Sequence, residues 1–182
     1  MKKLFTKKTI FFAILIFLLA LLGQPTAYGY LHPADAPILL AAMLLPTPSA
    51  LLAAGAASVA ADLFKGFYLL APVTLVIKLL MVLLAKKLIA LPLAKKHPEL
   101  MAAPALVLPV LGYFLGELLF SLFQGGFLAA ISAAIATLPK NLIQAGASIL
   151  IFIFLYDIAM GIRAARRKIR EEEEKKEEKI DE

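Results

Sequence analysis

The sequence contains no cysteine and no tryptophan, and it has two histidines among 182 residues. Without cysteine the chain cannot form a disulfide, use a thiolate nucleophile or bind a metal through sulfur. His32 and His97 lie far apart in sequence, and neither belongs to a cluster of metal-ligating residues. The chain also lacks a P-loop and a glycine-rich dinucleotide motif. We therefore expect no cofactor, no metal and no nucleotide site.

Charge is scarce over most of the chain, where long apolar runs take its place. Hydrophobic residues make up 62% of the sequence, and the mean hydropathy is +0.87. Soluble domains are nearer half apolar, so this composition predicts an integral membrane protein. The net charge of +6 sits in clusters at the ends and in one loop. It therefore does not indicate a nucleic-acid partner.

Apolar segments separated by proline, glycine and charge predict an all-α membrane protein, a six-transmembrane-helix bundle over residues 9–162. A basic N-terminus (1–8) precedes it, and a charged tail (163–182) follows. The segment 36–46 is too short to cross alone. We expect it to be tilted, buried among neighbours or broken at Pro46 and Pro48. The predicted spans are 9–27, 36–46, 48–65, 71–92, 101–124 and 134–162.

Basic residues predict which side of the membrane each loop faces. With six spans, the three clusters of lysine and arginine fall on one side, which is then the cytoplasm. Both termini are expected there, and the loops 23–35, 66–70 and 125–133 are expected outside. The clusters are Lys2, Lys3, Lys7 and Lys8; Lys86, Lys87, Lys95 and Lys96; and Arg163, Arg166, Arg167, Lys168 and Arg170.

The first apolar segment also resembles a secretory signal, because a basic start precedes it and the small residue Ala27 follows it. The stretch Gln24-Pro25-Thr26-Ala27 is a poor cleavage site, and cleavage would leave an odd number of spans. A retained helix is favoured. At the other end, Glu171 with Lys175 and Glu172 with Lys176 have the i,i+4 spacing of an exposed helix. We expect the tail to extend the last helix into solvent.

Polar residues from several spans are expected to gather in the outer half of the bundle. Tyr113, Glu117, Ser121 and Gln124 follow each other at helical spacing and share one stripe. Asp62 ends the third span, and Lys78 lies about two turns into the fourth. Lys140, Asn141 and Gln144 open the sixth span. This distribution predicts a pocket open to the outside.

Charges within lipid need partners, so we expect Asp62 and Lys78 to form a pair and Lys65 to stay solvated at the rim. The pair could serve only to pin two helices, or it could shape the pocket wall. The glycines in "GYFLG" favour close helix packing over ligand contact.

Three stretches resemble the substrate-binding S components of energy-coupling factor (ECF) vitamin transporters. They are residues 31–80 ("LHPADAPILLAAML…VIKLL"), "GYFLGE" and "LPKNLIQAG". The resemblance covers roughly residues 10 to 160 and is nearest the branch for hydroxymethylpyrimidine, pyridoxine and riboflavin uptake. One departure is the first span, "FFAILIFLLALL", which lacks the Ala-x-x-x-Ala docking pattern of many S components.

The resemblance implies a six-helix, non-enzymatic subunit in the cell membrane. Such a subunit captures a vitamin or precursor from outside, beneath the loop after its first helix. It then docks on a transmembrane scaffold subunit driven by two ATPase subunits. With Tyr113 from the polar stripe, the candidate substrate-binding residues are Asp35, Asp62, Lys78, Tyr113, Glu117, Asn141 and Gln144.

Two other classes of function remain as alternatives. A structural or morphogenetic membrane scaffold would use the polar residues to join helices. An intramembrane enzyme could use Asp62 and Glu117 as an acid and a base, but the sequence offers no accompanying nucleophile or metal cluster. Tight binding of a small molecule would separate substrate capture from both.

Overall fold

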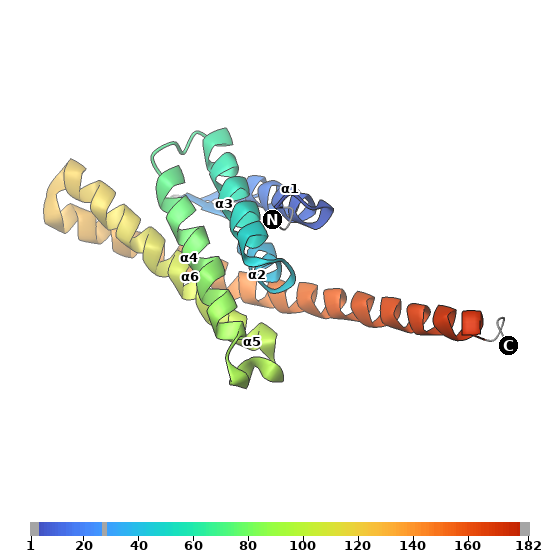
Figure 1. Ribbon diagram of the computed structural model, residues 1–182. Helices are drawn as coiled ribbons and strands as arrows, with labels where there is room; N and C mark the ends of the chain where they lie inside the picture. The colour runs from blue at the N-terminus through green and yellow to red at the C-terminus, as the bar shows by residue number, and fades with distance from the viewer. Residues whose placement is uncertain (1–3, 27–28, 179–182) are drawn as a thin grey trace.

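The computed structural model describes residues 4–26 and 29–178, with side-chain burial described for 4–24 and 31–173. The fold is predominantly helical (Figure 1). Its main helices are α1 (Lys7–Leu21), α2 (Asp35–Leu44), α3 (Thr47–Phe64), α4 (Ala71–Ile89) and α6 (Val107–Glu178). Between α4 and α6 lie three short elements: η1 (Pro92–Lys95), α5 (Pro98–Ala102) and η2 (Ala103–Leu106). The connection after α1 holds a small antiparallel hairpin, β1 (Gln24–Thr26) and β2 (Gly29–Leu31), which the sequence did not predict.

Helices α1 to α4 form a packed body in which α2 is almost completely enclosed. Residues Asp35–Ala42, the first eight of α2, are buried, and α2 contacts α1, α3, α4 and α6. Leu45 ends α2 in an extended conformation, and Pro48 lies in the first turn of α3. A proline there needs no amide hydrogen and has a suitable φ for starting a helix. Of the possibilities for the short segment 36–46, burial among neighbours is therefore confirmed.

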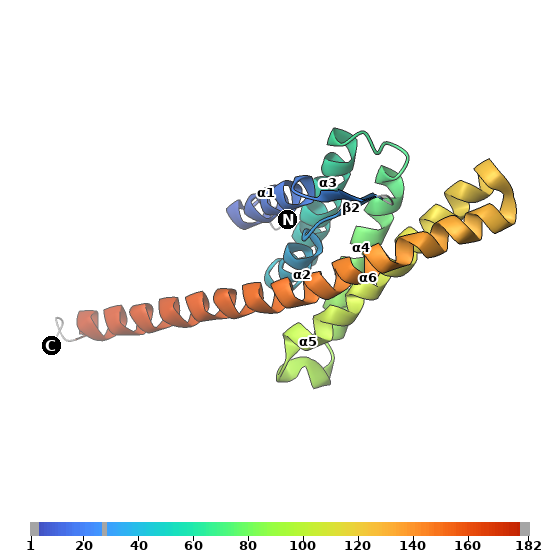
Figure 2. The ribbon, with the colours of Figure 1, turned by 180° about the vertical axis from the view of Figure 1, so that it is seen from behind.

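Helix α6 is a hairpin, although hydrogen bonding runs through it as one element. Gly126 has φ 79° and ψ 179°, a conformation that is not helical and that glycine adopts readily. The arm before Gly126 and the arm after it run antiparallel and side by side near the turn (Figures 1 and 2). The predicted loop 125–133 is therefore wrong. One glycine provides the reversal, and the chain from Phe127 onward is already helical.

Two stretches of the described residues are long and apolar enough to cross a membrane. They are α3 and the segment Pro98–Glu173, which contains the α6 hairpin. The predicted spans 101–124 and 134–162 correspond to its two arms, whereas α1 and α4 match the predicted first and fourth spans. The six-span count itself stays a prediction.

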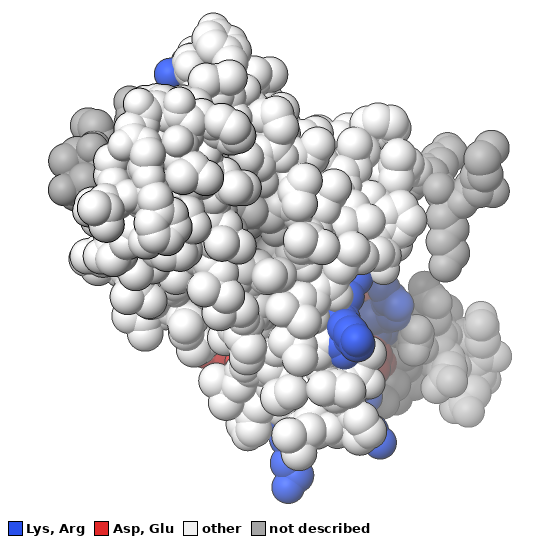
Figure 3. All heavy atoms as spheres, turned by 90° about the vertical axis from the view of Figure 1, so that its left-hand side faces the viewer, with Lys and Arg blue, Asp and Glu red and all other residues white. Residues whose placement is uncertain are grey.

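On the face shown in Figure 3 few side chains are charged, and most of these lie toward its lower end. The second arm of α6 continues beyond the body as a single rod (Figure 2) and reaches Glu178. Its residues from Gly161 to Glu173 are exposed. Arg167 Nε donates to Glu171 Oε1 at 2.7 Å. Helix α6 thus runs on to Glu178, while the side chains of Lys175 and Lys176 lie outside those described.

Candidate functional site

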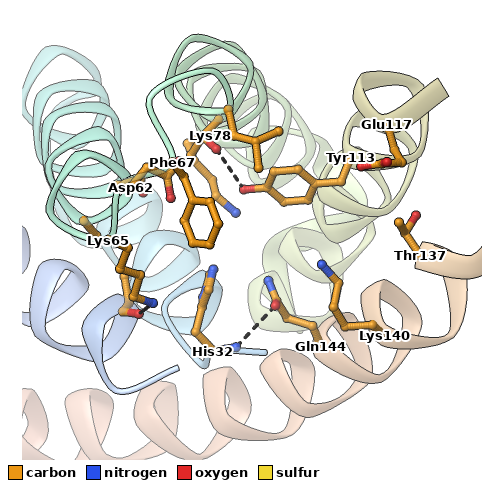
Figure 4. A pocket seen from close by; sticks show the side chains of 15 residues that line it. His32, Asp62, Lys65, Phe67, Lys78, Tyr113, Glu117, Thr137, Lys140 and Gln144 are labelled. Carbon is orange, nitrogen blue, oxygen red and sulfur yellow. Dashed lines mark hydrogen bonds between the residues drawn. The ribbon is translucent and has the colours of Figure 1, made fainter. Parts of the chain in front are cut away.

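A cavity opens where the body of α3 and α4 meets both arms of α6 (Figure 4). The space between its walls amounts to about 800 Å³ when the open mouth and the solvent in front of it are included. The wall combines apolar side chains with a high share of polar ones. The polar lining residues are His32, Ser58, Asp62, Lys65, Thr74, Lys78, Tyr113, Glu117, Thr137, Lys140 and Gln144.

An ion pair between Lys78 and Asp35 closes the floor of the cavity. Lys78 Nζ donates to Asp35 Oδ1, and both side chains are 1% exposed. Asp35 lies in the first turn of α2, where the positive end of the helix dipole favours a carboxylate. Gln144 Nε2 donates to the second oxygen of Asp35 at 2.9 Å. The buried carboxylate is therefore held by α4 and α6 together.

The expected pair between Asp62 and Lys78 is wrong, because Lys78 is paired with Asp35 instead. The sequence placed Asp35 in a surface loop, whereas α2 begins at Asp35 and carries it into the core. Asp62 still lines the same cavity, and its Oδ2 atom is buried with no hydrogen-bond partner among the described residues. Lys78 therefore pairs with Asp35, which is the more deeply buried of the two acids.

Tyr113 forms the wall opposite α3. Its hydroxyl lies 3.3 Å from Thr74 Oγ1 of α4, as the dashed line in Figure 4 shows. The Lys78 and Lys140 ammonium groups lie 5.3 Å and 5.9 Å from the centroid of its ring. Cations over an aromatic face are attracted by its quadrupole. The ring therefore helps to hold two positive charges beside the cavity.

The segment after the β-hairpin covers one side of the cavity. The His32 backbone amide donates to Gln144 Oε1 at 3.3 Å, so Gln144 joins this segment to Asp35. Burial lowers the pKa of the His32 imidazole from 6.5 to about 4, which leaves the ring neutral at pH 7. Its Nδ1 atom has no hydrogen-bond partner among the described residues.

Lys65 was expected to stay solvated at the rim of the pocket, but it does not. Its side chain is half-buried, and Nζ donates to the carbonyl oxygen of Ala20 near the end of α1. A lysine bound to a C-terminal carbonyl also complements the negative end of the helix dipole. Lys65 therefore joins α1 to the end of α3 at the mouth of the cavity.

The structure brings together most of the predicted site residues. Asp62, Lys78, Tyr113, Glu117 and Gln144 line the cavity, and Asp35 lies behind Lys78. Glu117 accepts a hydrogen bond from Ser121 Oγ at 2.9 Å, as their shared stripe predicts. Asn141 is buried next to Thr137, 3.5 Å from its hydroxyl, and does not line the cavity.

The structure adds several side chains to the wall that the sequence did not name as candidate site residues. His32 and Phe67 come from connections, and Thr74 and Thr137 from helices. Figure 4 shows Phe67 and His32 facing the same space as Tyr113. Threonines in apolar helices carry little signal, but spacing could have found Thr137, because it lies seven residues before Gln144 on the same helix face.

A family model for the S component of ECF-type riboflavin transporters matches residues 3–160 of the chain. Searches of curated proteins and of solved structures gave no match. The matched region contains every element from α1 to the middle of the second α6 arm, and with them the whole cavity wall. Members of this family are membrane-embedded transport subunits and not enzymes. The chain belongs to the ECF-type riboflavin transporter S component family.

Proposed function

We propose that this chain is the substrate-capture subunit of an ECF-type importer and binds a vitamin or vitamin precursor in the cavity. The observation that carries the proposal is the match of residues 3–160 to an S component family. The cavity supports it, because polar side chains from α3, α4 and α6 gather there between largely apolar helices. Intramembrane ionisable groups are expensive and usually serve a function.

Within this proposal, ligand contacts come from the polar wall and from two aromatic rings. Asp62, Glu117, Lys140 and Tyr113 present polar atoms, and Phe67 supplies an apolar face. Asp35 does not contact the ligand directly, because its two carboxylate oxygens accept hydrogen bonds from Lys78 and Gln144. It holds these two side chains in position. Asn141 supports the helix and does not touch the ligand.

We also propose that both termini are cytoplasmic and that a scaffold subunit and two ATPase subunits drive uptake. The basic clusters support this orientation, and the chain itself lacks a nucleotide motif. The natural absence of cysteine makes the topology simple to test. Single cysteines at Phe127 and Lys95 should be labelled from outside and only after permeabilisation, respectively. The reverse labelling would overturn the orientation.

Ligand binding tests the central proposal. The purified chain in nanodiscs is titrated with riboflavin, with its flavin fluorescence as the readout. Replacing Glu117 with glutamine should weaken binding about tenfold or more, since a hydrogen bond to a charged group contributes about 1.5–3 kcal/mol. Asp157→Asn is the matched control, because Asp157 is exposed and lies on α6 away from the cavity wall. Equal effects of the two substitutions would place the ligand elsewhere.

A second measurement addresses energy coupling. The chain alone in liposomes should bind ligand without concentrating it, even when ATP is supplied. Uptake against a gradient should appear only when scaffold and ATPase subunits are added. ATP-driven accumulation by the chain alone would overturn the proposed division of labour.

A further inference from the structure

The part of α6 that projects beyond the body carries an apolar stripe. Leu155, Ile162 and Ile169 follow each other at intervals of seven residues and therefore share one face of the helix. Leu155 packs against the core, whereas Ile162 is 48% and Ile169 is 55% exposed. This part of α6 lies away from the other elements (Figures 1 and 2). The face that contacts the body thus continues beyond it as an exposed apolar stripe.

Basic side chains lie along both edges of this stripe. At helical spacing, Arg166 and Arg170 fall on one side of Ile169, and Lys168 falls on the other. All four side chains are exposed. An apolar face bordered by lysine and arginine is typical of helices that lie in the interface of a membrane. The aliphatic stems of the basic residues can lie along apolar surface while their charged ends reach phosphate groups.

The charge reverses directly after the stripe. Glu171, Glu172 and Glu173 are exposed, and an anionic surface would repel them. Arg167 pairs with Glu171 at 2.7 Å, and both lie on the face opposite Ile169. A contact with an anionic surface would therefore end near Arg170.

The arm that precedes the stripe is longer than a bilayer is thick. From Phe127 to Tyr156 it contains a single charged residue, Lys140. This stretch is about 45 Å long at 1.5 Å per residue, against about 30 Å for the hydrocarbon core. Such a mismatch favours a tilted helix. A tilted helix leaves the membrane at a shallow angle, which brings one face of its next turns to the level of the lipid headgroups.

We propose that residues 162–170 of α6 bind the anionic phospholipid headgroups of the membrane that holds the chain, with Ile162 and Ile169 inserted among the lipids. The charge of the stripe's edges favours this partner. A second copy with its helix in the same direction would bring like charges together. The segment lies beyond the residues matched by the family model, which end at 160, so the inference goes beyond the proposed function. Its role is to fix the tilt of the second α6 arm.

The sequence contains no tryptophan, so one introduced tryptophan reports on its own surroundings. Ile169→Trp places the probe on the stripe. Ala164→Trp is the matched control, because Ala164 is exposed on the opposite face and the change alters no charge. The full chain is reconstituted in liposomes of phosphatidylcholine with or without phosphatidylglycerol. Lipids with brominated acyl chains then quench a tryptophan that contacts the hydrocarbon.

In liposomes with phosphatidylglycerol, we expect quenching of Ile169→Trp to exceed that of Ala164→Trp about twofold or more. Without the anionic lipid the difference should disappear. Equal quenching at the two positions, or the same difference in both kinds of liposome, would overturn the inference. A blue-shifted emission of Ile169→Trp without quenching by brominated lipid would show that a second copy covers the stripe, and this would overturn it too.

Charge variants made together with Ile169→Trp test the basic edges. One variant removes the three flanking charges: Arg166→Gln, Lys168→Gln and Arg170→Gln. Its quenching should fall to the level found without phosphatidylglycerol. A control removes three exposed lysines near the end of α4 and in the connection that follows, and it should leave quenching unchanged: Lys87→Gln, Lys95→Gln and Lys96→Gln. Thermal unfolding shows whether each variant is folded. Equal effects of the two triple variants would contradict binding at the stripe. Because the measurement uses no vitamin, its failure leaves the proposed function intact.

Discussion

Helices α2 and α6 are both rich in apolar residues, but they lie in opposite surroundings. In α2, the first eight of ten residues are buried by other helices. In the segment Pro98–Glu173, which holds most of α6, 11% of the most apolar 18-residue stretch is buried, against 44% for α3. One helix thus forms the core of the body, and the other exposes most of its apolar surface. High hydrophobicity alone does not distinguish protein contact from lipid contact.

The polar cluster lies where these two regions meet. Asp35 belongs to α2, Lys78 to α4, and Gln144 to the second arm of α6. The Gln144 side chain links the region of α2 to α6 through Asp35 and through the His32 backbone. The joint between the enclosed body and the exposed hairpin therefore contains a polar cluster beside apolar contacts, such as the packing of Phe152 into the core.

The largest effect is expected from breaking the ion pair in the body. Asp35→Asn or Lys78→Met leaves one buried charge without its partner, which typically destabilises by about 3–5 kcal/mol. The double variant should recover much of this loss. A double-mutant cycle of thermal unfolding in detergent measures the coupling. If the two single effects simply add, the residues are not partners.

The contact between α4 and α6 should be nearly as sensitive to added volume. A Cβ atom at Gly112 would lie 2.5 Å from Ile77 Cγ1. Gly112→Ala should therefore destabilise by about 1–3 kcal/mol through overpacking. Gly146→Ala, on the exposed side of α6, is the control, since a Cβ there meets nothing within 4 Å. That change should stabilise the helix by up to about 1 kcal/mol. Similar unfolding temperatures for both variants would contradict the close contact.

Acid should weaken the segment that joins the β-hairpin to α2. The pKa of His32 is lowered to about 4 in the folded chain and is 6.5 for the free side chain. The unfolded state therefore binds more protons between these values, and stability falls as the pH drops from 6.5 toward 4. Between pH 7 and pH 5 the loss should be about 1–2 kcal/mol.

His32→Gln should flatten this profile, which unfolding in detergent at a series of pH values measures. His97→Gln is the control, because the His97 side chain is 68% exposed and lies in the connection between η1 and α5. A profile that keeps its slope in His32→Gln would assign the acid sensitivity to other groups.

The smallest effect is expected in the part of α6 that projects beyond the body. Arg167 and Glu171 form an exposed i,i+4 pair, 2.7 Å apart. Such pairs contribute about 0.3–0.5 kcal/mol. Arg167→Ala should leave ligand affinity unchanged and shift the unfolding temperature by less than one degree. A loss of ligand affinity would show that the projecting segment of α6 affects binding in the cavity.

The segments that carry the helices could be predicted from the sequence because a bilayer imposes lengths and demands internal hydrogen bonding. The α6 turn was misplaced because hydropathy does not show how few residues a reversal needs. Gly125 and Gly126 look like the start of a loop, whereas a single positive φ at Gly126 is enough. The strand pair β1 and β2 was missed because the two strands have three residues each.

Most of the residues in the site could be predicted, but their partners could not. A charge in an apolar segment is visible in sequence, so Asp62, Lys78 and Glu117 stood out. The sequence placed Asp35 in a loop, because the residues around it do not show that α2 begins at Asp35 and is buried in the core. Asn141 was placed in the cavity, but it points toward Thr137 instead. Helical spacing in a sequence shows which residues share a face of the helix, but it does not show what that face contacts.

The sequence by itself determined that this chain is helical, apolar and divided by basic clusters, because these properties follow from composition and spacing. Its family followed from recognisable stretches. The tertiary structure alone decided that Lys78 binds Asp35 and that the Oδ2 atom of Asp62 has no hydrogen-bond partner among the described residues. The physical reason is that an ion pair depends on which acid lies within reach in the buried interior. That is decided by how α2 packs against α4 and α6, and no spacing along the chain records it.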